Sequence, residues 1–144
     1  MTYKPHVLVV DDEKEFANTL AKRLELRNYK TKVAYSGQEA LDILAEGLID
    51  LVILDVLMPG MDGCETLAQI KTDLPLIPVL MLTGEATVER AIAGMKAGAL
   101  DFLMKPCDIG VIAEKLEGAY KLKCDHEARI RDAEINNLIN RKGW

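Results

Sequence analysis

The sequence predicts an α/β fold in which five parallel strands form one doubly wound sheet with five helices on its two faces. Three observations lead to this prediction. Five short apolar runs of strand length alternate with segments in which apolar residues recur at helical spacing. Glycine or proline stands between several of these segments, where turns are expected. The 144 residues of the chain suit a single domain of ordinary size.

The first half of the chain accounts for three strands and two helices. The expected elements are a strand at 6–10, a helix at 13–26, an alternating strand at 29–35, a helix at 37–47 and a strand at 50–55. Ser36 fits the N-cap of the second helix, because Glu39 three residues later completes the pattern of a capping box. Gly47 is expected to end that helix.

The second half continues the alternation. The expected elements are a helix at 62–74, a strand at 78–83, a helix at 86–98, a strand at 101–105 and a last helix from about residue 108. Pro75 and Pro78 separate the third helix from the strand that follows it. Gly98 is expected to end the fourth helix.

The last predicted helix is longer than the sheet requires. No proline interrupts it between Asp108 and about Arg141. Its first turns carry apolar residues that can cover the sheet, whereas the later sequence is charged and has only a thin apolar stripe. We therefore expect a globular domain at 1–122 and a helical extension or linker at 123–144. The extension is either a solvated helix that frays or a short dimerising coiled coil.

The strand order follows from the hydropathy of the strands. The first and third strands are the most apolar, so they are expected at the centre of the sheet. The order 2-1-3-4-5, the flavodoxin-like arrangement, meets this condition with right-handed crossovers. In such a sheet a ligand binds at the carboxyl ends of the strands, at the switch point between the first and third strands.

The composition excludes several classes of function. A net charge of −5 argues against nucleic-acid binding, which needs a basic surface. No apolar run is long enough to span a bilayer, and the N-terminus lacks the features of a signal peptide. We therefore expect a cytoplasmic protein with no membrane segment.

Cys64, Cys107 and Cys124 are widely spaced and are expected to be reduced thiols.

Polar side chains stand at the ends of four predicted strands. Asp11 and Asp12 follow the first strand, Asp55 ends the third, Thr83 ends the fourth and Lys105 ends the fifth. Because parallel strands end at the same edge, three acids, a hydroxyl and an amine are expected to converge there. The three carboxylates repel one another unless a cation screens them. A Mg²⁺ ion, which prefers oxygen ligands, would resolve this conflict.

The remaining residues of this edge suit phosphoryl transfer onto Asp55. Lys105 can pair with Asp55 or with an oxygen anion attached to it. Thr83 offers a hydroxyl, and Gly84 beside it has no side chain to obstruct a ligand. The Lys105–Pro106 bond is a candidate cis peptide. An aspartate can attack phosphorus to form an acyl phosphate, helped by alignment and charge neutralisation.

Four motifs, VLVVDDE, LVILDVLMPGMDG, PVLMLTG and AGALDFLMKP, occur in this order along the chain. With them, the sequence resembles the receiver domain of two-component response regulators over about residues 4–122. The resemblance implies that Asp55 is the phosphoacceptor. It also implies that Asp11, Asp12, Asp55 and the backbone carbonyl of Leu57 bind Mg²⁺, directly or through water.

The same resemblance implies a conformational switch. Thr83 and Lys105 would contact the phosphoryl group, and Phe102 would move between outward and inward rotamers as Thr83 moves. This step would remodel the face formed by the fourth helix, fifth strand and fifth helix. Phe102 stands where many members have tyrosine, so it lacks a hydroxyl for a partner. Leu57 and Glu85 occupy the positions that tune the lifetime of the phosphate.

The resemblance also implies partners. The donor would be a sensor histidine kinase or a phosphotransfer protein, and activation is expected to favour a homodimer. The chain would then be a signalling phosphoacceptor that assists only its own phosphorylation and dephosphorylation. It is either a single-domain regulator or a piece that ends in the linker helix of a longer one.

Other functions fit the residues less well. A phosphohydrolase of the haloacid dehalogenase kind needs a second acid two residues after the nucleophile, where this chain has Leu57. A receiver-like module that works without phosphorylation would be expected to lack Asp12, Asp55 or Lys105, and none is missing. Neither a P-loop nor a dinucleotide-binding glycine motif is present. The one serine, Ser36, lies outside any nucleophile elbow.

Overall fold

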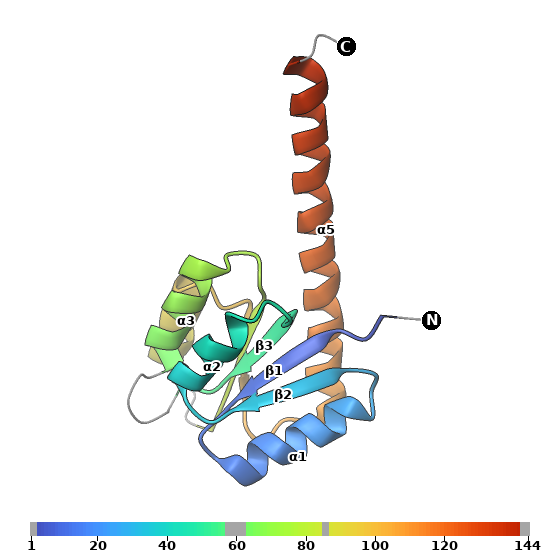
Figure 1. Ribbon diagram of the computed structural model, residues 1–144. Helices are drawn as coiled ribbons and strands as arrows, with labels where there is room; N and C mark the ends of the chain where they lie inside the picture. Colours follow the sequence, from blue (N-terminus) through green and yellow to red (C-terminus); the bar gives the residue numbers. More distant parts are fainter. Residues whose placement is uncertain (1–2, 57–62, 85–86, 142–144) are drawn as a thin grey trace.

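The computed structural model describes residues 3–56, 63–84 and 87–141. These residues form five strands and five helices in strict alternation (Figure 1). The strands are β1 (His6–Val10), β2 (Lys30–Ala34), β3 (Leu51–Leu54), β4 (Val79–Thr83) and β5 (Asp101–Met104). The helices are α1 (Lys14–Glu25), α2 (Gly37–Leu44), α3 (Gly63–Asp73), α4 (Val88–Lys96) and α5 (Ile109–Arg141).

The strands form one parallel sheet in the order β2-β1-β3-β4-β5, which confirms the predicted fold class and strand order. Every residue of β3 and β4 is buried, as are the last four of β1. β2 alternates between exposed and less exposed residues, as expected of an edge strand. Four of the five strands are one or two residues shorter than predicted, and β1 has the predicted bounds. As a result, Asp55 and Lys105 lie just past the ends of β3 and β5.

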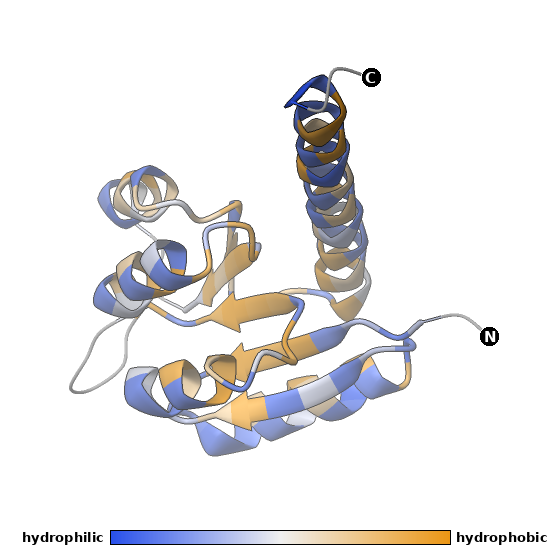
Figure 2. Ribbon diagram, turned by 45° about the horizontal axis from the view of Figure 1, so that its top comes forward, coloured by the Kyte–Doolittle hydropathy of each residue, from blue (hydrophilic) through white to orange (hydrophobic). Residues whose placement is uncertain are grey.

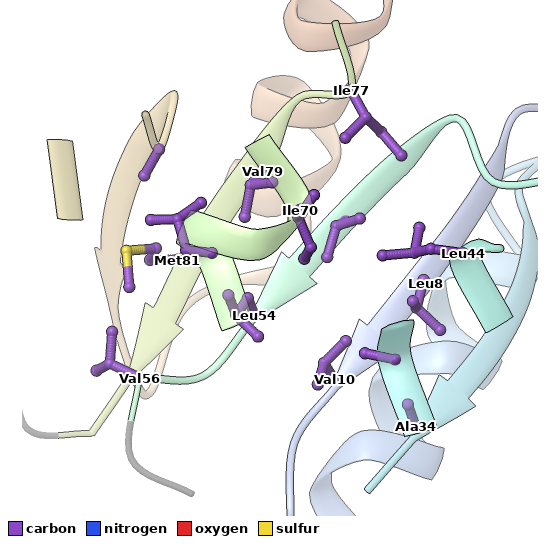
Figure 3. Packing of buried hydrophobic residues seen from close by; sticks show 14 residues of the cluster. Leu8, Val10, Ala34, Leu44, Leu54, Val56, Ile70, Ile77, Val79 and Met81 are labelled. Carbon is purple, nitrogen blue, oxygen red and sulfur yellow. The ribbon is translucent and has the colours of Figure 1, made fainter. Parts of the chain in front are cut away.

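Successive residues of each strand point to opposite faces of the sheet, so the core has two halves. On one face, Leu8 and Leu54 pack with Leu44 of α2 and Ile70 of α3 (Figure 3). On the other face, apolar residues of β1 and β3 pack against α1 and α5. Figure 2 shows the resulting band of hydrophobic strands between helices with hydrophilic outer faces.

Local sequence signals set the helix ends. The Ser36 hydroxyl accepts a hydrogen bond from the Glu39 N–H at 3.2 Å, as the predicted N-cap requires. The Glu39 carboxylate accepts from the Tyr35 N–H at 3.3 Å instead of the expected Ser36 N–H, so the capping box closes one residue early. Gly47 has φ +81°, which favours glycine after the helix.

α5 is one continuous helix of 33 residues. Its buried side chains are Ile112, Leu116 and Ala119, all in the first third. The helix then projects past the sheet, and residues 129–141 are exposed throughout (Figure 1). Among the described residues, no helix is both long and apolar enough to cross a membrane. The three cysteines form no disulfide bond in the described part of the chain.

Candidate functional site

Backbone hydrogen bonds continue one residue past the strands and fix the residues that follow them. The Asp11 N–H donates to the Ala34 carbonyl at 3.0 Å, and the Asp55 N–H donates to the Val10 carbonyl at 3.0 Å. The Lys105 N–H donates to the carbonyl of Thr83 at 2.8 Å. The sheet therefore holds these three polar residues and the buried Thr83 along its carboxyl edge.

Three carboxylates meet at the switch point between β1 and β3. Asp11, Asp12 and Asp55 each offer an oxygen, and these oxygens lie within 4.8 Å of one another. Asp11 and Asp55 are only 2% and 4% exposed, whereas Asp12 is more accessible. Burial raises the pKa of Asp11 above its usual range, although hydrogen bonds from Lys105 and the Glu13 N–H partly offset this effect.

One ammonium group neutralises much of this charge. Nζ of Lys105 lies 2.6 Å from Asp11 Oδ2, 3.1 Å from Glu13 Oε1 and 3.3 Å from Asp55 Oδ2. Its side chain is 11% exposed. Burial alone would lower the pKa of Lys105, but the hydrogen bond to Asp11 and the charges of Asp11 and Asp55 raise it above the ordinary value. The Lys105–Pro106 peptide bond is cis.

The site also contains two residues to which the sequence pattern assigned no role. Glu13 adds a third carboxylate to Lys105, and the ring of Phe16 lies 4.1 Å from the same ammonium. Both residues lie at the start of α1, with Glu13 at its N-cap. Glu13 adjoins the acidic pair in the sequence and could have been considered. The position of Phe16 depends on how α1 packs beside the β5–α5 connection.

Gly63 brings the start of α3 against the end of β3. A Cβ atom at this position would overlap the backbone of Asp55 and Val56. The Gly63 N–H donates to the Val56 carbonyl at 3.0 Å. Glycine is therefore required at the start of α3, and its close approach supports the backbone at Asp55.

The residues expected to form the switch lie at β4, β5 and α4. Thr83 is completely buried at the end of β4. A Cβ atom built on Gly84 would meet no atom of the described residues within 4 Å. Phe102 is partly buried against the core, and a Cβ atom on Gly94 of α4 would lie 3.8 Å from its ring. Leu57 and Glu85 lie outside the described residues.

The donor set suits a hard divalent cation. Three carboxylate oxygens within 4.8 Å of one another, two of them on buried residues, match the preference of Mg²⁺ for a few carboxylates and additional oxygen ligands. Asp11, Asp12 and Asp55 are therefore the residues that could hold Mg²⁺. The expected backbone ligand at Leu57 falls in the segment that is not described.

A five-stranded sheet in this order, with an acidic cluster and a lysine at its switch point, defines a flavodoxin-like α/β domain with a charged site at its carboxyl edge. The family profile described as "response regulator receiver domain" matches residues 7–117. The chain belongs to this family of receiver domains, as the sequence motifs indicated.

Relatives with curated descriptions are transcriptional or response regulators. The transcriptional regulatory protein ZraR of Salmonella typhimurium is 44% identical over 116 residues, which are 81% of this chain and 26% of that protein. The response regulator MprA of Mycolicibacterium vanbaalenii is 40% identical over 100 residues, which are 69% of this chain and 43% of that protein. The chain thus spans about a quarter of the length of ZraR.

Solved structures share the fold. A CheY-like receiver domain protein from Methanospirillum hungatei superposes with a TM-score of 0.82 at 25% identity, over 86% of this chain and 99% of that one. The receiver domain of NtrX from Brucella abortus gives a TM-score of 0.76 at 32% identity, over 80% and 98%. A longer NtrX structure, in complex with ATP, matches 91% of this chain and 30% of that one, with a TM-score of 0.83 at 28% identity.

Proposed function

We propose that this receiver domain accepts a phosphoryl group on Asp55 from a phosphohistidine of a sensor kinase or phosphotransfer protein. A carboxylate oxygen of Asp55 would form the new P–O bond while the P–N bond to the donor imidazole breaks and its electron pair stays on that nitrogen. The observation that carries this proposal is the placement of Asp55 among two acids and Lys105 at the switch point.

The neighbouring residues have separate roles in this reaction. Asp11, Asp12 and Asp55 would hold Mg²⁺ together with the carbonyl of Leu57, and the bound ion supplies positive charge to the phosphoryl oxygens. Lys105, already 3.3 Å from Asp55, would contact the transferred group. The domain thereby assists its own phosphorylation and dephosphorylation and does not turn over external phosphoesters.

The proposal includes a switch at the α4-β5-α5 face. Thr83 would turn its hydroxyl to the phosphoryl group, and Phe102 would change rotamer into the space that Thr83 leaves. Gly84 has no side chain, and a Cβ atom built there would lie in open space among the described residues, so this position does not obstruct a group bound on Asp55. Leu57 and Glu85 would set the phosphate lifetime. A partner, a second receiver or an output domain would then recognise the altered face.

The remainder of the chain would connect the switch to an output. We assign residues 1–122 to the receiver and 123–144 to a helical extension or linker, which fits the match of a longer NtrX structure to 91% of the chain. ZraR, about four times longer than the matched region, is a transcriptional regulatory protein. Control of transcription by a longer protein, homodimer formation on activation and a cytoplasmic location belong to this proposal.

Modification by a small phosphodonor tests the central step. Wild type and Asp55→Asn would be incubated with acetyl phosphate and Mg²⁺, and the intact mass would be measured. Wild type is expected to gain one phosphoryl group in a Mg²⁺-dependent manner, whereas Asp55→Asn does not. Equal responses of the two proteins would refute the assignment of Asp55 and favour a receiver-like module that works without phosphorylation.

A further inference from the structure

The ammonium of Lys105 rests on an aromatic ring as well as on carboxylates. Its Nζ lies 4.1 Å from the centroid of the Phe16 ring, well within the range of a cation–π interaction. Phe16 lies in the first turn of α1, and Lys105 directly follows β5. The ring packs against the hydrophobic core between the sheet and helices α1 and α5, and this packing holds the ring in place.

The same ammonium forms an ion pair with Asp11, a carboxylate that would also bind Mg²⁺. Lys105 contacts Asp11 Oδ2 at 2.6 Å, and Asp11 belongs to the group of three acids that could hold Mg²⁺. Two cations on one carboxylate would repel each other strongly in this buried place. A metal bound at Asp11 therefore competes with the ammonium for this carboxylate. Any contact that holds Lys105 where it is opposes metal binding.

We propose that Phe16 is a positioning residue that holds the Lys105 ammonium on Asp11 in the metal-free protein, so that Mg²⁺ must displace it. The inference rests on the proposed function, because it takes Asp11 as a Mg²⁺ ligand. The ring stabilises the metal-free arrangement and thereby lowers Mg²⁺ affinity. The ammonium already lies 3.3 Å from Asp55 Oδ2, so a shift off Asp11 would keep it near an anion carried by Asp55.

Mg²⁺ titration of the full chain by calorimetry, without any phosphodonor, tests this role. Phe16→Leu keeps an apolar side chain in the core but removes the aromatic face. It is expected to bind Mg²⁺ about threefold to tenfold more tightly than wild type. Phe16→Tyr restores an aromatic face and should return the affinity to that of wild type. Phe16→Met serves as a second non-aromatic variant if the leucine protein does not fold.

Two controls separate positioning from a general packing effect. In a Lys105→Met background, Phe16→Leu should no longer change Mg²⁺ affinity, because the cation that it positions is gone. The chain also offers a matched pair elsewhere, in which Lys14 Nζ lies 5.1 Å from the Tyr35 ring. Tyr35→Leu is expected to leave the Mg²⁺ affinity unchanged.

The outcomes distinguish this inference from the proposed function. Unchanged or weaker affinity in Phe16→Leu, or an equal effect with Lys105 replaced, would overturn the role of Phe16 and leave the proposed function intact. If the Phe16 results hold while Asp55 gains no phosphoryl group, the proposed function alone fails. A wild-type chain that binds no Mg²⁺ would overturn both the Mg²⁺ site and this inference.

Discussion

At the scale of single residues, Gly63 at the start of α3 lies directly against the backbone of the candidate nucleophile, Asp55. We expect Gly63→Ala to lower the free energy of unfolding by roughly 1–3 kcal/mol, because the new Cβ atom must displace the backbone of Asp55 and Val56. The displacement should also slow modification of Asp55 by acetyl phosphate. Urea denaturation and intact-mass kinetics measure the two effects.

Gly118 offers a matched control on α5. A Cβ atom at this exposed helical position would meet no atom within 4 Å. Gly118→Ala should therefore stabilise the protein by about 0.5–1 kcal/mol, since alanine favours the helix over glycine. If Gly63→Ala proved as stable as Gly118→Ala, the close approach at Gly63 would carry no energetic constraint.

Sequence reasoning located some of the site's residues and missed others for a physical reason. Asp11, Asp55 and Lys105 could be found because each directly follows a strand, and parallel strands bring such residues to one edge. Phe16 and Glu13 lie at the start of α1, where their approach to Lys105 depends on how the helix packs. A hydropathy pattern contains no information on that packing beyond which side of the helix faces the core.

At the scale of elements, the middle of α5 is connected through Asp50 to the amino-terminal ends of β1 and β3. This carboxylate accepts hydrogen bonds from the Tyr3 hydroxyl and the His6 N–H, both at 2.8 Å. Lys123 of α5 lies 3.4 Å from Asp50 and 3.0 Å from Glu127, and its side chain is 15% exposed. The sequence predicted the helix but could not predict this connection, because it joins three segments that are distant along the chain.

We expect Asp50→Asn to loosen α5 where it leaves the domain. The amide can still accept hydrogen bonds, but Lys123 loses a nearly buried anionic partner, at a cost of about 1–2 kcal/mol in unfolding free energy. Hydrogen exchange should become faster around residues 120–128, with little change in β3 or β4. Uniform acceleration across the sheet would contradict a local role.

The pH dependence of stability provides a second measurement on this variant. The hydrogen bond to Asp50, with burial and the charge of Asp50, raises the pKa of Tyr3 from its ordinary value of 10.0 to about 12. Because the folded value is the higher one, this contribution to stability is present below pH 10 and is lost as the pH rises through 12. The loss should be smaller in Asp50→Asn. Asp42, an exposed residue of α2 that accepts a hydrogen bond from Gln38, provides the control. Asp42→Asn should show the same dependence of stability on pH as wild type.

At the scale of the whole molecule, the receiver body and the outer part of α5 differ in what stabilises them. The body has a two-sided core, whereas α5 buries no side chain after Ala119. Most of the stability of a helix in a protein comes from packing of its apolar face and not from intrinsic helix propensity. The hydropathy pattern therefore left open whether the extension frays or pairs. In the structure the helix is continuous to Arg141, and the large apolar residues in its outer part are exposed to solvent.

These exposed apolar residues yield the prediction that tests whether the extension aids self-association. Four of them are 38–54% exposed: Ile130, Ile135, Leu138 and Ile139. Replacing all four with glutamine should change the unfolding free energy of the body by less than about 0.5 kcal/mol, because surface substitutions away from packed contacts have small effects. With beryllofluoride and Mg²⁺ as the phosphoryl mimic, light scattering should show the wild-type mass rising toward a dimer and the variant remaining a monomer.

A control and a contrary result complete this test. Leu26 and Leu48 are 86% and 54% exposed elsewhere on the molecule, and replacing both with glutamine should leave the rise in mass intact. If the variant with the altered extension still dimerises on activation, self-association resides in the receiver body, and the α4-β5-α5 face becomes the surface to alter next. If wild type keeps one mass with and without the mimic, activation does not assemble this chain, and the proposed homodimer is wrong.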